Sequence, residues 1–220
     1  MDLKAIAFDL DGTLYPHYMM YLASLGLGVR HPRLVWHFGR VRSEIRRVRP
    51  IDDFRAVQAR MLAGRMGISE EEARSLIEEK IYTRWEQSLR RLRPYPHLKE
   101  VLAALAEDGY RLAVLSDFPV LAKLEFLGLD GFWDVAMCTE ESGYLKPNPE
   151  PFLLLAERLG FVPEQILYVG NSYAYDIVGG HAAGLRTAHL VRRPPKGSIA
   201  DVSFRTYPEL LTWVRGMRSS

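Results

Sequence analysis

The sequence predicts a doubly wound α/β fold with an all-helical segment inserted near its N-terminus. From about residue 94 onward, short apolar runs alternate with amphipathic segments, which is typical of a parallel sheet with crossover helices. Residues 4–10 form one more apolar run, which ends in carboxylates. Residues 16–93 instead carry helical apolar spacing without an alternating strand pattern. We therefore predict a core of residues 1–15 and 94–220 and a helical insert of residues 16–93.

The elements of the core follow a repeated order in which a helix ends and an apolar run follows. Residues 97–108 place four apolar side chains on one helical face, and Gly109 ends that helix before a strand at 111–116. The later helices are predicted at 120–127, 149–159, 173–183 and 208–218, and the later strands at 133–138, 165–169, 186–191 and 201–204. Ligands of such sheets bind beyond the carboxyl ends of the strands, so we expect the functional residues there.

The composition is that of an ordinary globular protein. The 220 residues are 48% apolar and 25% charged, which suffices for a sizeable core. The 29 basic and 27 acidic residues leave a net charge of +2, which favours neither a nucleic-acid binder nor a membrane-surface protein. No apolar stretch reaches the ~20 residues of a membrane helix, and the single Cys138 excludes an internal disulfide. We expect a cytoplasmic protein without a signal peptide, and neither membrane nor nucleic acid as a partner.

The clearest motif directly follows the first predicted strand. Asp9 and Asp11 stand one residue apart, and Gly12 frees the backbone immediately after them. Such a pair can direct one carboxylate at a substrate and the other at its leaving group. An isolated Asp-x-Asp is also compatible with two solvated acids at a strand end. The complete string DLDGTL after an N-terminal strand, however, resembles the first motif of the haloacid dehalogenase superfamily of phosphohydrolases.

Three later strand ends carry candidates for the remaining motifs of that superfamily, in the expected order. Ser116 matches a residue that hydrogen-bonds the transferring phosphoryl oxygens, and Lys146 in KPNPEPF matches the lysine that neutralises nucleophile and phosphoryl charge. The string GNSYAYD at 170–176 looks like the fourth motif, with Asp176 as its second acid. Each residue alone also fits a structural role, such as a helix cap, a solvated lysine or a first-turn acid. The joint order is what makes the resemblance specific.

The fourth motif departs from the family's usual form at one position. Asn171 stands where the family usually has an acid that binds Mg²⁺ directly. An amide oxygen can coordinate a hard cation, but it supplies a dipole in place of a charge, so we expect weaker metal binding. Asp176 keeps a carboxylate that can bind metal-bound water or orient Lys146. The resemblance therefore implies a Mg²⁺ site made by Asp9, Asp11 through its backbone carbonyl, Asn171 and Asp176.

The resemblance also implies a Rossmann-like fold with a helical, C1-type cap after the first motif, in agreement with the independent prediction for residues 16–93. In the implied mechanism Asp9 attacks phosphorus and forms an aspartyl-phosphate, while Asp11 protonates the leaving alcohol and later deprotonates water. Ser116 and Lys146 hold the phosphoryl oxygens. The predicted function is Mg²⁺-dependent hydrolysis of a small phosphorylated metabolite, whose identity the resemblance does not give.

Three other functions stay open at the level of sequence. A haloacid dehalogenase needs only the nucleophile and usually lacks the second acid, so Asp11 argues against it. A phosphomutase shares the fold and the motifs. A catalytically weakened binding or regulatory protein would explain Asn171, but the other motif residues argue against it.

The insert has two further features. Nine arginines and three acids between residues 30 and 60 give a local charge balance of +6. We interpret most of these arginines as a solvated face, with the alternative that some select a substrate bearing further anionic groups.

His17 is interpreted as a helix start, with a site role as the alternative. A set of apolar side chains near the start of the insert is expected to pack its core, and the alternatives are contact with substrate or with a second subunit. The set comprises Tyr18, Met19, Met20, Tyr21, Leu22 and Leu25. The oligomeric state is left open.

Overall fold

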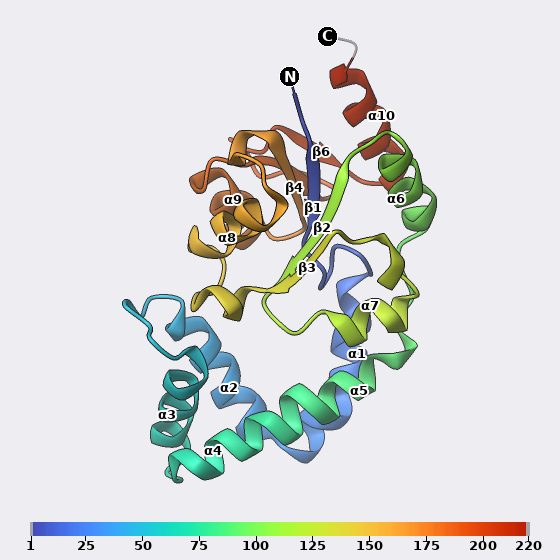
Figure 1. Cartoon of the computed structure of the whole chain (residues 1–220). Helices are drawn as coiled ribbons and strands as arrows, with labels where there is room; N and C mark the ends of the chain where they lie inside the picture. The colour runs from blue at the N-terminus through green and yellow to red at the C-terminus, as the bar shows by residue number, and fades with distance from the viewer. Residues whose placement is uncertain (1, 219–220) are drawn as a thin grey trace.

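The computed structural model describes residues 2–218 and contains a six-stranded sheet with helices on both faces (Figure 1). The strand order is β3-β2-β1-β4-β5-β6, and all neighbouring strands are parallel. The strands are β1 Ala5–Phe8, β2 Arg111–Ser116, β3 Val135–Cys138, β4 Ile166–Gly170, β5 Arg186–Leu190 and β6 Val202–Phe204. The order reverses at β1, so its carboxyl end is the switch point of a doubly wound sheet. The predicted fold class is confirmed.

The helices of the core agree with the predicted pattern within a few residues at each end. They are α6 Leu98–Glu107, α7 Leu121–Leu127, α8 Glu150–Leu159, α9 Val178–Ala182 and α10 Tyr207–Arg218. A π-helical turn, η6 Tyr173–Ile177, leads into α9. Short 3₁₀ turns lie at η3 Asp130–Phe132, η4 Thr139–Ser142 and η5 Pro163–Gln165.

The burial of β1 determines the position of the carboxylates that follow it. Side chains alternate between the two faces of a strand, and Ile6 and Phe8 join the hydrophobic cluster that includes α6 and α10. Ala5 and Ala7 join the cluster formed with α8 on the other face. Because helices cover both faces, all four residues of β1 are buried. The carboxylates that follow Phe8 are therefore delivered to the open edge of the sheet.

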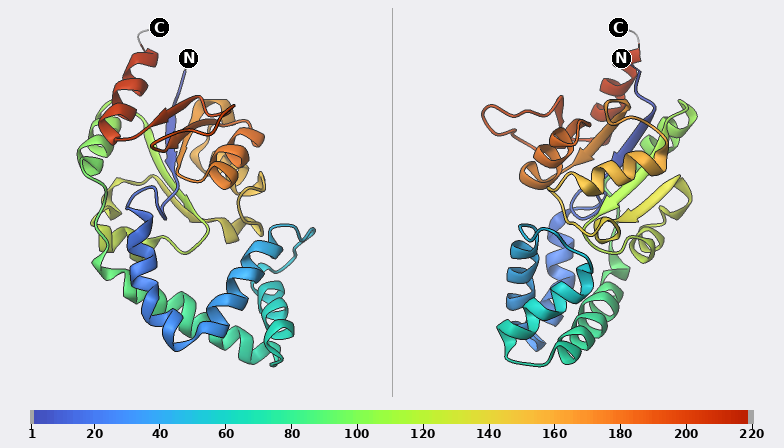
Figure 2. Two further views of the ribbon diagram at one scale, coloured as in Figure 1. Left: turned by 180° about the vertical axis from the view of Figure 1, so that it is seen from behind. Right: turned by 60° about the vertical axis from the view of Figure 1, so that its left-hand side comes forward.

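The helical insert lies beyond the carboxyl ends of the strands (Figures 1 and 2). It contains α1 His17–Arg30, α2 Pro32–Ile45, α3 Phe54–Met66, α4 Glu70–Leu76, the π-helical η1 Ile77–Trp85, α5 Glu86–Ser88 and the 3₁₀ turn η2 Leu89–Arg91. From α4 through η1 to α5 the chain forms one continuous helical segment, which we call the rod. The rod begins at a capping box in which the Ser69 hydroxyl accepts from the Glu72 N–H and the Glu72 carboxylate accepts from the Ser69 N–H.

The apolar residues of α1 differ from the prediction that they pack the core of the insert. Met19 and Met20 do pack against the hydrophobic core. Tyr18, Tyr21, Leu22 and Leu25 are instead exposed, each by about three-fifths of its surface. The reason is geometric: α1 is apolar around most of its circumference, and a helix at the edge of a bundle can bury only one side. Among the described residues, no helix is both long enough and apolar enough to span a membrane.

Candidate active site

All six residues that the sequence analysis selected line one cavity of about 220 Å³ at the carboxyl end of the sheet. They come from the loop after β1, the last residue of β2, the loop before α8, and the segment after β4 that leads into and includes η6. Parallel pairing sets Phe8 beside Val114 and Val169, which brings the ends of these three strands together. The selected residues are Asp9, Asp11, Ser116, Lys146, Asn171 and Asp176. His17 and Met20 of α1 also line the cavity, so the insert contributes part of its wall.

Asp9 is held through both of its carboxylate oxygens. Lys146 Nζ lies 2.7 Å from Oδ1, and the Thr13 hydroxyl donates to Oδ2 at 2.8 Å. Burial raises the pKa of Asp9 to about 7; Lys146 opposes this rise, whereas the carboxylates of Asp176 and Asp11 add to it. A carboxylate that attacks as an anion therefore needs more positive charge beside it than Lys146 supplies.

Lys146 joins the acids of the first and fourth motifs. Its ammonium group is 3.1 Å from the Tyr168 hydroxyl and 2.7 Å from Asp176 Oδ1, in addition to its contact with Asp9. Burial alone lowers the pKa of Lys146, but Asp176 and Asp9 outweigh burial and raise it above its usual value. Gly170 makes the arrangement possible, because a Cβ there would lie 2.3 Å from Asp176 Cβ.

Asp11 is engaged by three side chains. The Tyr15 hydroxyl donates to Oδ1 at 2.5 Å, the Ser116 hydroxyl donates to Oδ2 at 3.0 Å, and Lys123 Nζ contacts both oxygens at 2.9 and 2.7 Å. Burial raises the pKa of Asp11, but Lys123 and these hydrogen bonds outweigh it, so the pKa lies below its usual value. Asp11 is therefore ionised in the free protein.

The oxygen donors of the cavity fit a hard cation. The Thr13 hydroxyl lies 2.8 Å from Asp9 Oδ2 and 3.2 Å from Asn171 Oδ1. Both oxygens therefore lie within hydrogen-bond distance of the same hydroxyl group. Three carboxylates face the ammonium groups of Lys123 and Lys146, an excess of one negative charge in this cluster. The described residues contain no group of three His, Cys, Asp or Glu side chains able to hold a metal. A cation here would therefore need amide and backbone oxygens as well.

Lys123 is the main residue of the site that the sequence analysis missed. It is 1% exposed and lies on α7, with its ammonium group 5.5 Å from the centre of the Phe118 ring and 5.9 Å from that of Trp85. A signal was present in the sequence: Lys123 follows Val120 by three residues and precedes Leu127 by four, which places it on the apolar face of its helix. A lysine at such a position requires a buried acidic partner.

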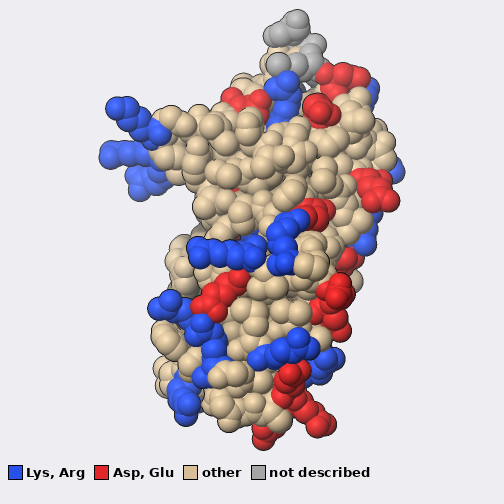
Figure 3. All heavy atoms as spheres, turned by 90° about the vertical axis from the view of Figure 1, so that its left-hand side faces the viewer, with Lys and Arg blue, Asp and Glu red and all other residues tan. Residues whose placement is uncertain are grey.

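Seven of the nine arginines between residues 30 and 60 are exposed, as the interpretation of a solvated face predicts, whereas Arg42 and Arg46 are not. Arg42 Nη1 lies 2.5 Å from Glu140 Oε1, and Arg46 Nη2 lies 2.6 Å from Asp117 Oδ2. Arg49 pairs with Glu150. In the lower half of the face drawn in Figure 3, basic and acidic side chains lie interspersed. The charges of these three arginines are paired within the protein.

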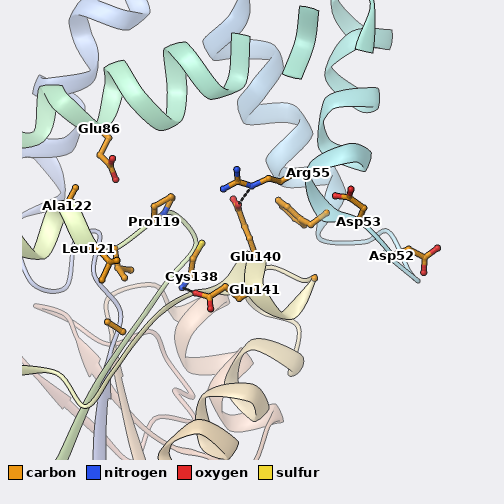
Figure 4. A pocket seen from close by; sticks show the side chains of 14 residues that line it. Asp52, Asp53, Arg55, Glu86, Pro119, Leu121, Ala122, Cys138, Glu140 and Glu141 are labelled. Carbon is orange, nitrogen blue, oxygen red and sulfur yellow. Dashed lines mark hydrogen bonds and ion pairs between the residues drawn. The ribbon is translucent and has the colours of Figure 1, made fainter. Parts of the chain in front are cut away.

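A larger cleft of about 820 Å³ between the insert and the core contains none of the six selected residues (Figure 4). Arg55 of α3 and Glu140 of η4 face each other across it, with 3.9 Å between Nε and Oε2. Arg42 and Phe118 stand at the side of Glu140, with the guanidinium 4.5 Å from the ring centre. We assign the chemistry to the smaller cavity because the charged groups converge there.

Comparison with known proteins places this geometry in a family. A family model for haloacid dehalogenase-like hydrolases matches residues 3–184. The chain belongs to this family. Phosphoglycolate phosphatase of Haemophilus influenzae is 31% identical over 95% of this chain and 97% of its own length. Glyceraldehyde 3-phosphate phosphatase of Methanopyrus kandleri is 30% identical over 86% of this chain and 84% of its own. The protein is therefore a hydrolase of this family whose curated relatives are named as phosphatases.

Solved structures agree with this fold. A 2-haloacid dehalogenase from Pseudomonas syringae has a TM-score of 0.70 at 24% identity and covers 98% of this chain and 99% of its own. A phosphatase from Thermococcus onnurineus has a TM-score of 0.63 at 24% identity, with 96% and 98% covered. Dehalogenases and phosphatases thus share this architecture, and the residues of the site must separate the two activities.

Proposed function

We propose that the protein is a Mg²⁺-dependent phosphatase that hydrolyses a small phosphate ester through an aspartyl-phosphate on Asp9. One observation carries the proposal: Asp9, clamped by Lys146 and Thr13, faces the same 220 Å³ cavity as Asp11, Ser116 and the residues of the fourth motif. A second carboxylate two residues after the nucleophile provides the proton transfer that ester cleavage needs. Displacement of halide needs no such acid.

In the first step an oxygen of Asp9 attacks phosphorus, and the bond from phosphorus to the ester oxygen breaks. Asp11 gives a proton to the departing alcohol. Asp11 is ionised in the free site, and the incoming phosphate, a like charge, raises its affinity for the proton that it must carry. Ser116 releases its hydrogen bond to Asp11 and donates to a phosphoryl oxygen, while Lys146 offsets the charge of the transferring group.

In the second step water attacks phosphorus, and Asp11 accepts its proton. The bond between Asp9 and phosphorus breaks, inorganic phosphate leaves and the carboxylate is restored. Asp9, the backbone carbonyl of Asp11, Asn171 and Asp176 would hold Mg²⁺, which supplies the positive charge that an anionic substrate requires here. Asp176 also orients Lys146 through their 2.7 Å contact.

The cavity favours a substrate with few atoms beyond the phosphoryl group. Its volume of about 220 Å³ is below the range of roughly 300–1,000 Å³ for drug-sized ligands. The names of the two relatives likewise refer to phosphates of small carbon skeletons. We propose residues 16–93 as a cap domain that closes this cavity and limits substrate size through His17 and Met20, and residues 1–15 and 94–220 as the catalytic core.

A panel of substrates with and without Mg²⁺ tests the proposal. We expect phosphate release from phosphoglycolate and glyceraldehyde 3-phosphate at a kcat/KM at least about tenfold above that for ATP, and none in EDTA. Release of inorganic phosphate and of chloride from 2-chloropropionate should be measured in parallel. Chloride without phosphate would establish a dehalogenase, an isomeric phosphate product would establish a mutase, and no turnover of any substrate would leave a binding protein.

Replacing Asn171 with aspartate tests the metal site. The added charge should lower the Mg²⁺ concentration for half-maximal activity by about tenfold, because carboxylates bind hard cations more tightly than amides. The variant Asn171→Ala should raise that concentration, since it removes the oxygen altogether. A Mg²⁺ titration of phosphate release that is the same in both variants as in the unaltered protein would place Asn171 outside the metal shell.

A further inference from the structure

The helix α1 has the composition of a buried helix but lies at the surface of the insert. Between His17 and Val29 it contains no Asp, Glu, Lys or Arg, and none of its residues is fully buried. Its inner side carries Met19, Met20 and Leu27, which pack against the hydrophobic core. A helix that is apolar on all sides is normally covered on all sides. The outer side of α1 therefore lacks its cover within the described residues.

The exposed side chains form one stripe, which we call the α1 stripe: Tyr18 at 62%, Tyr21 at 62%, Leu22 at 61%, Leu25 at 59% and Val29 at 80% exposure. Their spacing of three, four, seven and eleven residues from the first keeps them on a single helical face. Five side chains of this size present on the order of 600 Å² of surface, against the roughly 800 Å² that each partner buries in a standard interface. The stripe alone is close to the area that a stable dimer needs.

A hollow lies beside the stripe. A cavity of about 450 Å³ is formed between α1 and the segment around η2, with Tyr18 and Leu22 on one side and Ser88, Arg91 and Leu92 on the other. Protruding tyrosine and leucine side chains therefore stand next to a cavity large enough to receive a side chain of the same kind. A two-fold symmetric interface requires such a pairing, in which the side chains of one copy enter the hollow of the other.

The lack of charge on the α1 stripe indicates which kind of partner covers it. Helices that lie on anionic membranes carry Lys and Arg on the polar face beside their apolar face, whereas the opposite side of α1 is packed against the protein and bears no charge before Arg30. Interfaces between identical chains are the more apolar class of protein interface. We propose that the α1 stripe and the adjoining hollow form the interface of a symmetric homodimer.

Sedimentation velocity and light scattering of the full chain test this proposal. We expect the unaltered protein to run at about twice its chain mass of 25.2 kDa at micromolar concentration. The double variant Leu22→Glu and Leu25→Glu should weaken the dimer on the order of 100-fold and give monomers. Both positions are exposed, so thermal unfolding of the isolated monomer should show a folded protein.

The matched control is Leu121→Glu, which changes a leucine that is 71% exposed on α7 of the core. This variant should remain a dimer. Co-sedimentation with vesicles of phosphatidylcholine and phosphatidylserine tests the alternative that the α1 stripe binds a membrane. We expect the protein to stay in the supernatant. A monomeric unaltered protein, a double variant that still dimerises, or binding to the vesicles by a monomer would each overturn the proposal.

Discussion

Asp9→Asn is expected to abolish phosphate release, with a loss of roughly 10⁴-fold or more in kcat. The amide nitrogen and oxygen of asparagine cannot form the aspartyl-phosphate, so the loss cannot be recovered by substrate concentration or by Mg²⁺. Phosphate release from the best ester of the panel is the measurement. Asp130→Asn, at an exposed position in η3 of the core, is the matched control and should retain normal turnover.

The same substitution should leave the stability of the fold close to normal. Asparagine has the shape of aspartate, and its side-chain oxygen can still accept from Lys146 or Thr13. Because the pKa of Asp9 is raised to about 7, its charge is unfavourable in the folded protein near neutral pH, and a neutral amide avoids that cost. Thermal unfolding should therefore show an unchanged or slightly higher midpoint. Turnover at the normal rate in a folded Asp9→Asn protein would remove Asp9 from its proposed role.

The sequence was sufficient to predict the sheet and the residues that meet at its edge. Glycines such as Gly109 end the helices, short apolar runs mark buried strands, and parallel strands must end at the same side. These rules bring Ser116, Lys146 and Asp176 to Asp9 without any knowledge of rotamers. The structure places all of them at one cavity, while their chemical roles stay proposals that the substitutions above test.

The parts that could not be predicted depend on which partner a side chain finds. Helical spacing identifies the apolar positions of α1 but not whether a neighbour covers them, so the sequence predicts Tyr18 and Leu22 in the interior, whereas the structure exposes both. Spacing likewise puts Arg42 on the apolar face of α2, yet its partner Glu140 lies 98 residues away. The pairing of a buried charge is a property of the tertiary fold.

Lys123→Met is expected to destabilise the fold by about 3–5 kcal/mol, because it leaves the largely buried carboxylate of Asp11, whose side chain is 14% exposed, without its cationic partner. Methionine keeps most of the volume and the contacts with Phe118 and Trp85, so loss of packing contributes little. Chemical denaturation gives the free energy of unfolding. Lys99→Met, an exposed lysine on α6, is the control and should change that free energy by no more than about 0.5 kcal/mol.

A second substitution separates the charge pair from other effects of Lys123. The double variant Lys123→Met and Asp11→Asn removes both charges of this pair, so it should be more stable than Lys123→Met alone. Lys123→Met should also slow release from alkyl phosphates more than from p-nitrophenyl phosphate, whose leaving group needs little protonation, because Lys123 positions the acid that protonates it. A double variant no more stable than the single one, or equal losses on both kinds of ester, would show that Lys123 acts only through packing.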